Sequence, residues 1–193
     1  VILIALTLAT DFKQRGRILV MAVAALVFLV IMVAVVLSID DVREVFEQRA
    51  KLTQSYDEGR TGRFGKMLLA IPKLLDHPNG LGPLRFSLYF FEDPHNTYVN
   101  GFTNFGWFGG LAYLTLIALT LYIGFRHVFE RSPWQRDAIA VWAALLMHFV
   151  QGFQIDTNTW RHFNMMMGLI WGMAAAWTVI KWRHEKRLAA GRS

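Results

Sequence analysis

The sequence contains no cysteine in its 193 residues, and only 18% of its residues are charged. The absence of cysteine excludes disulfides and thiolate metal sites. The P-loop, the His-Glu-x-x-His zinc motif and the glycine-rich dinucleotide turn are also absent from the sequence. We therefore expect neither a metal site nor a cofactor.

Apolar residues dominate the chain. They make up 54% of it, which is too much for a soluble domain of this length to bury in one core. Residues 18–38 hold no charge, and three more apolar segments near the ~20 residues needed to cross a bilayer follow at 105–125, 137–153 and 163–180. We predict an all-α fold, a polytopic transmembrane helical bundle that forms a single membrane domain over 1–193.

The start of the chain is also apolar. Residues 1–10 have no basic segment before them, which disfavours a signal peptide. At about 1.5 Å per residue they would cover about half of a bilayer. We interpret the chain as a C-terminal fragment of a longer protein, cut inside a helix.

The formal net charge of +6 is compatible with nucleic-acid binding, but the basic residues sit at the ends of apolar segments. They are Lys13, Arg15 and Arg17, then Arg126, Arg131 and Arg136, and finally Lys181, Arg183, Lys186, Arg187 and Arg192. Such clusters mark the cytoplasmic side of a membrane protein. Residues 39–104 and 154–162 then face the opposite side, and we expect no nucleic-acid partner.

The long segment 39–104 has helical periodicity in two places. Residues 41–56 predict a charged surface helix. In 63–76 the apolar residues recur at three- and four-residue steps, which predicts an amphipathic helix on the membrane surface or the bundle. Pro72 falls inside that helix, so we expect a kink, with a split into two helices as the alternative.

Four sequence elements follow in order. Arg63 opens the amphipathic helix, the turn Asp76-His77-Pro78-Asn79-Gly80-Leu81-Gly82 ends it, and Asp93-Pro94-His95-Asn96 precedes the glycine-rich start of the next apolar segment, Asn104-Phe105-Gly106. This arrangement resembles the O-antigen ligase and O-antigen polymerase superfamily, specifically over residues 60–110. Met67 departs from the family pattern, in which an aromatic residue is common, and a further upstream arginine of the family lies outside this chain.

The resemblance implies a glycosyltransferase of the bacterial inner membrane with its active site facing the periplasm. It would transfer a glycan from an undecaprenyl diphosphate carrier to an acceptor such as lipid A core, in lipopolysaccharide biosynthesis. The implied catalytic residues are Arg63 and His95, and the implied substrate-binding residues are Arg60, Lys66 and Asn96.

Residue chemistry agrees with this assignment. An arginine binds two phosphate oxygens at once and stabilises the charge on a departing diphosphate. An imidazole can take the proton of an acceptor hydroxyl near neutral pH. We therefore expect a metal-independent glycan transfer that involves Arg63 and His95 and inverts the configuration at the anomeric carbon.

Several alternatives stay open at this point. Three acceptors fit the motifs, namely lipid A core, a growing glycan and a protein, since an O-antigen polymerase or protein O-oligosaccharyltransferase would carry much the same motifs. A membrane transporter or scaffold is the alternative from another class. Arg60 competes with Arg63 for the diphosphate, and capping a helix is the alternative role of His95. Gly168 and Gly172 are more typical of close helix packing than of catalysis.

Overall fold

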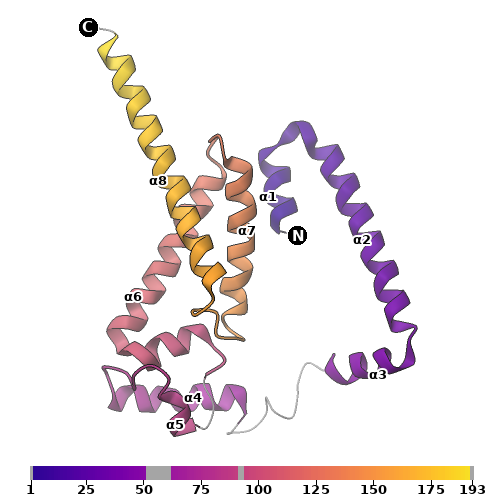
Figure 1. Cartoon of the computed structure of the whole chain (residues 1–193), viewed down its shortest axis with the longest axis vertical. Coiled ribbons are helices and arrows are strands. Elements are labelled where there is room, and N and C mark those ends of the chain that lie inside the picture. The colour runs from indigo at the N-terminus through magenta and orange to yellow at the C-terminus, as the bar shows by residue number, and fades with distance from the viewer. Residues whose placement is uncertain (1, 51–61, 91–93, 192–193) are drawn as a thin grey trace. The chain divides into compact units, whose positions relative to one another are not determined.

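The computed structural model describes residues 2–50, 62–90 and 94–191, in which the chain forms eight α-helices and a short 3-10 helix (Figure 1). The all-α prediction is confirmed. Within these described ranges, three helical segments are long and apolar enough to cross a membrane: Phe12–Leu37, Thr97–Val128 and Arg161–Ala190. The chain divides into two compact units, Val1–Leu68 and Leu69–Ser193.

In the first unit, α1 (Ile2–Thr10) and α2 (Arg15–Leu37) contact each other across the 3-10 turn Phe12–Gln14. Arg15 holds this turn, because its Nε donates to the Leu8 carbonyl at 2.8 Å and its guanidinium lies 3.7 Å above the Phe12 ring. None of the most apolar stretch of α2 is buried. A helix that is apolar all round and uncovered by protein fits a lipid environment.

α3 (Asp40–Arg49) follows α2 and carries Asp40 and Asp41 in its first turn, where acidic side chains complement the helix dipole. The predicted charged helix at 41–56 is confirmed as far as Arg49. Its residues 51–56 lie outside the described part of the chain.

In the second unit, α6 (Thr97–Val128), α7 (Gln135–Gln151) and α8 (Arg161–Ala190) pack against one another in pairs. Gly124 lets the three helices approach, since a Cβ there would meet the Trp142 ring and lie 3.1 Å from Ile170. The Trp142 indole donates to the Leu121 carbonyl at 3.2 Å. The buried side chains of this bundle include Ile139, Leu145, Phe149, Phe163, Met167 and Ile170.

α6 and α8 extend beyond the predicted apolar segments, whereas α7 keeps the length of the segment predicted at 137–153 and lies two residues earlier. α6 begins at Thr97 instead of 105, because Asn96 caps it, and it is interrupted by non-helical backbone at Gly106. α8 continues to Ala190 instead of 180, because the residues after Ile180 are mostly good helix formers. α7 has 17 residues.

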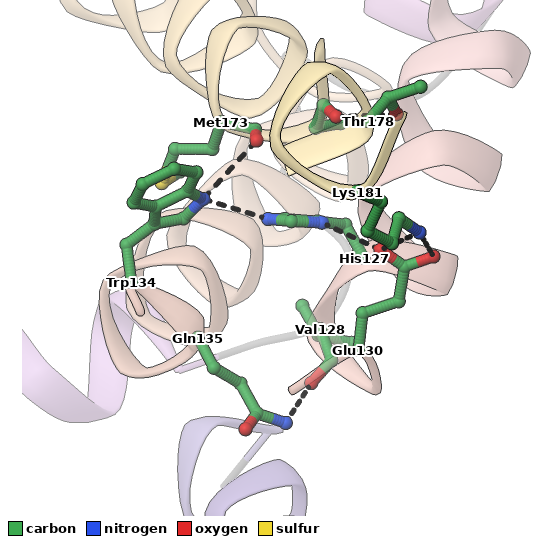
Figure 2. Close-up of polar contacts among 9 residues, drawn as sticks. His127, Val128, Glu130, Trp134, Gln135, Met173, Thr178 and Lys181 are labelled. Atoms are coloured by element: carbon green, nitrogen blue, oxygen red, sulfur yellow. Dashed lines mark hydrogen bonds and ion pairs between the residues drawn. The ribbon is translucent and has the colours of Figure 1, made fainter. Parts of the chain in front are cut away.

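The connection 126–136 meets α8 at Lys181, at the end of the bundle that we call the basic end (Figure 2). Residues 182–190 continue α8 beyond this contact. Buried His127 accepts a hydrogen bond at Nε2 from the Trp134 indole at 3.2 Å, and its Nδ1 lies 3.6 Å from Glu130. Lys181 Nζ is 3.2 Å from both carboxylate oxygens of Glu130. Polar contacts therefore join α8 to the connection between α6 and α7.

Candidate functional site

Residues 94–104 and 152–160 meet at the other end of the bundle, which we call the polar end. Thr97 joins the two segments, because its backbone N–H donates to the Gly152 carbonyl at 2.8 Å and its hydroxyl accepts from the Thr157 N–H at 2.6 Å. α4 (Arg63–Asp76) and α5 (Phe86–Phe90) belong to this end of the fold (Figure 1). All the site residues predicted from the motifs lie in or before α4, or just before α6.

Asn96 is the N-cap of α6. Its Oδ1 accepts from the backbone N–H groups of Tyr98 and Val99, both at 3.0 Å, and its Nδ2 donates to the Phe153 carbonyl at 3.2 Å. The capping role considered for His95 therefore falls on its neighbour. His95 is half-buried and directly precedes this anchored residue. The backbone at His95 is thus held at the polar end, and the substrate-binding role of Asn96 stays a prediction.

The predicted basic residues lie around the start of α4. The bounds of α4 agree with the predicted amphipathic helix, and it is continuous through Pro72, so the alternative of two separate helices is wrong. Arg63 is the first residue of α4, with its side chain outside the described part, and Arg60 lies wholly outside it. Lys66 is half-buried one turn later. Lys66 belongs to the first compact unit and His95 to the second, so their joint use of one substrate stays a prediction.

Part of the apolar stripe of α4 is buried against the protein, and part of it is exposed. Ala70 and Leu74 are buried, and Ala70 packs in a small cluster with Leu81 and Phe86. Leu68, Ile71 and Leu75 are instead exposed. One side of α4 therefore attaches to the fold, while its other apolar side is uncovered by the described chain.

The turn after α4 fits into the break in α6. The Trp107 N–H donates to the Pro78 carbonyl at 3.0 Å, and the Leu81 N–H donates to the Thr103 carbonyl at 2.6 Å. Gly80 and Gly106 both have positive φ, at 82° and 70°, and a Cβ on Gly80 would lie 2.9 Å from the Thr103 carbonyl oxygen. Gly80 and Gly106 thus have a structural role, because the turn and α6 can come this close only where both residues lack a Cβ.

A chain of polar side chains runs from the connection between α7 and α8 along α6. The Asn100 amide donates to the Asp156 carboxylate, and the Asn104 amide donates to Asn100 Oδ1 at 2.6 Å. The sequence reasoning missed these residues. Their signal was present, since Asn96, Asn100 and Asn104 recur every four residues and so share one helix face.

A cavity of about 480 Å³ lies beside this chain. Its lining comes from the 83–84 turn, from both sides of the break in α6 and from the connection between α7 and α8. The lining residues are Pro83, Leu84, Asn100, Gly101, Asn104, Phe105, Tyr113, Asp156, Asn158 and Thr159. Of these, Asp156 alone carries a charge. The size is within the range typical of small-molecule sites.

Two further expectations from the sequence concern the glycine pair in α8 and a metal site. No described residue lies within 4 Å of a Cβ placed at Gly168 or Gly172, so the expected close packing on them is not seen within this chain. Across residues 2–50, 62–90 and 94–191, no three His, Asp or Glu side chains gather at one point suited to a metal ion.

Searches against family models, curated proteins and solved structures found no match to this chain.

Proposed function

We propose that this chain is part of a bacterial inner-membrane glycosyltransferase that moves a glycan from undecaprenyl diphosphate to an acceptor such as lipid A core. One observation carries the proposal. His95 is held at the polar end by its anchored neighbour Asn96, on the same helix end that lines a 480 Å³ cavity with amide and hydroxyl groups. A reaction between sugars needs a concave site in which a few placed hydrogen-bonding groups orient the substrate.

The membrane arrangement that we propose has four crossings in this chain, by α2, α6, α7 and α8. The 17 residues of α7 extend about 26 Å at 1.5 Å per residue, close to the lower limit for a crossing. The basic end would face the cytoplasm, in accord with the positive-inside rule. The polar end would then face the periplasm, and the exposed apolar side of α4 would lie on the membrane surface.

In the proposed reaction, the oxygen of an acceptor hydroxyl attacks the anomeric carbon of the carrier-linked sugar. The new carbon–oxygen bond forms as the bond to the diphosphate breaks, and the bonding electron pair leaves with undecaprenyl diphosphate. The hydroxyl proton passes to the His95 imidazole. Arg63 stabilises the charge on the departing diphosphate with its planar pair of donors, assisted by Arg60 and Lys66.

The test is glycan transfer by the full-length protein in membranes. His95→Ala should reduce turnover by about 10²- to 10⁴-fold, as expected for loss of a general base. Arg63→Lys keeps the charge but loses the bidentate geometry, so it should weaken carrier binding or turnover. The matched controls are His184→Ala and Arg183→Ala at the exposed end of α8, which should transfer at the normal rate.

All variants are compared at equal membrane abundance, so that a folding defect is not mistaken for a catalytic one. Near-normal transfer by His95→Ala would remove its catalytic role. Unchanged carrier binding by Arg63→Ala would move the diphosphate site to Arg60 or to another part of the protein.

A further inference from the structure

We propose that the cavity at the polar end binds the sugar of a substrate through its hydroxyl groups, and does not bind the diphosphate. This inference rests on the proposed function for the identity of the sugar. Its physical basis is separate: the direction of the hydrogen bonds in the lining, two buried polar atoms without partners, and the charge of the walls.

The hydrogen bonds of the lining have a fixed direction. A carboxylate only accepts, so the Asn100 amide nitrogen must point at Asp156 and its Oδ1 must point the other way. That oxygen accepts from the Asn104 amide nitrogen at 2.6 Å. Asn104 is consequently oriented too, and its Oδ1 stays available as an acceptor. The cavity thus offers an acceptor that suits a ligand with O–H or N–H donors.

Two more lining groups await a partner. The Tyr113 hydroxyl and the Asn158 side-chain oxygen are buried and have no hydrogen-bond partner among the described residues. Buried polar groups are nearly always paired, because leaving one unpaired costs about 1 to 3 kcal/mol. Asn158 Oδ1 can only accept, whereas the Tyr113 hydroxyl can donate and accept. A sugar hydroxyl, which also does both, has the chemistry to pair with either group.

The charge of the walls disfavours a diphosphate. Among the residues that line the cavity, Asp156 is the one ionisable at neutral pH, and its negative charge would repel phosphate. Phosphate oxygens are acceptors and would face the acceptor oxygens of Asn104 and Asn158. Pro83, Leu84 and Phe105 add apolar wall, which can pack against the C–H surface of a sugar ring.

The experiment measures binding of two neutral disaccharides, maltose and N,N′-diacetylchitobiose, to the full chain in nanodiscs by saturation-transfer NMR. Inorganic pyrophosphate serves as the competitor. Tyr113→Phe should weaken disaccharide binding by about 3- to 10-fold, the range expected for one hydrogen bond, and Asn104→Leu should weaken it further. Tyr122→Phe, on the same helix but at the basic end, should leave binding unchanged. Pyrophosphate should not compete.

Tyr113→Phe also separates a binding role from a packing role. Removing a buried, unpaired hydroxyl should raise the melting temperature of the ligand-free protein, so weaker binding there cannot come from poorer folding. If neither disaccharide shows Tyr113-dependent binding, or if pyrophosphate competes, the inference is overturned. A third outcome is that His95→Ala abolishes transfer while the Tyr113 and Asn104 variants keep the normal KM for the acceptor. In that case only the cavity assignment fails. If disaccharides bind as expected but no glycan is transferred, only the proposed function fails.

Discussion

Asn96 and His95 are neighbours at the polar end and differ in exposure. Asn96 is only 8% exposed and uses both ends of its side chain on backbone groups, two in α6 and one at Phe153 beyond α7. His95 is more exposed and lies one residue before it. A proton-transferring group benefits from such a neighbour, because the backbone that carries it is held from two sides. In the reaction that we propose, Asn96 would act by positioning His95.

Asn96 substitutions should show its structural role in graded steps. Asn96→Ala removes the cap and the bond to Phe153, and should lower stability by about 1 to 3 kcal/mol. Asn96→Asp keeps the capping oxygen but loses the donor to Phe153. Its stability should therefore lie between those of the unchanged protein and Asn96→Ala. The measurement is thermal unfolding in detergent, with Gln154→Ala on the exposed connection as control. Equal melting temperatures for Asn96→Ala and the control would contradict the cap.

At the basic end, the ion pair of Glu130 and Lys181 should contribute little. Their side chains are 32% and 43% exposed, so solvent and salt screen the charges. A double-mutant cycle with Glu130→Gln and Lys181→Met should give a coupling below about 1 kcal/mol that shrinks as salt is added. The same cycle with Lys186→Met should show none. A larger, salt-independent coupling would mean that the pair is shielded from water.

At the scale of elements, the interruption of α6 is what builds the polar end. Non-helical backbone at Gly106 leaves the Trp107 N–H and the Thr103 carbonyl without helical partners, and the turn after α4 supplies Pro78 and Leu81 to them. Backbone polar groups are thus satisfied although the helix is broken. The cavity takes its lining from both sides of this break.

Gly106→Ala should disrupt this arrangement. The backbone at φ 70° and ψ −169° is essentially confined to glycine, at a cost of about 1 to 3 kcal/mol for other residues, and a Cβ would collide with the backbone of Pro78 and Asn79. We expect a clear loss of melting temperature in detergent. Gly168→Ala is the matched control, because nothing lies within 4 Å of its Cβ and alanine is the better helix former. If both variants melted alike, the turn would not pack in the break.

The elements could be predicted from the sequence better than the site. Apolar runs identified α2, α6, α7 and α8, and the three- and four-residue steps identified α4 with its bounds, because these patterns are local. The start of α6 was missed, since residues 97–104 mix polar and apolar side chains and follow a loop-like sequence. The cavity could not be predicted, because Tyr113, Asn104 and Asn158 come together only through the break at Gly106 and the packing of α8. The proposed roles of Arg63 and His95 rest on the motifs and on residue chemistry, which the sequence already contains.

At the scale of the whole chain, polar groups are sorted to opposite ends of the α6–α8 bundle. Amides, hydroxyls and the cavity gather where α6 begins, and Arg126, Arg131 and Lys181 gather where it ends. Between these ends the outward surface of α6 is apolar, with Leu111, Leu116 and Leu119 exposed. The order of polar end, apolar middle and basic end fits a bilayer, because a bilayer is apolar in the middle and favours lysine and arginine on its cytoplasmic side.

This sorting predicts the topology, which single cysteines can test without background because the chain has no native cysteine. Gln154→Cys lies at the polar end, and Arg131→Cys and Ala189→Cys lie at the basic end, all three at exposed positions. In spheroplasts, a membrane-impermeant maleimide should label position 154 alone, and the other two only after lysis. Labelling of 131 together with 154 would show that α7 does not cross the membrane. Labelling of 189 but not 154 would invert the topology, placing His95 in the cytoplasm and removing the basis for transfer at the periplasmic face.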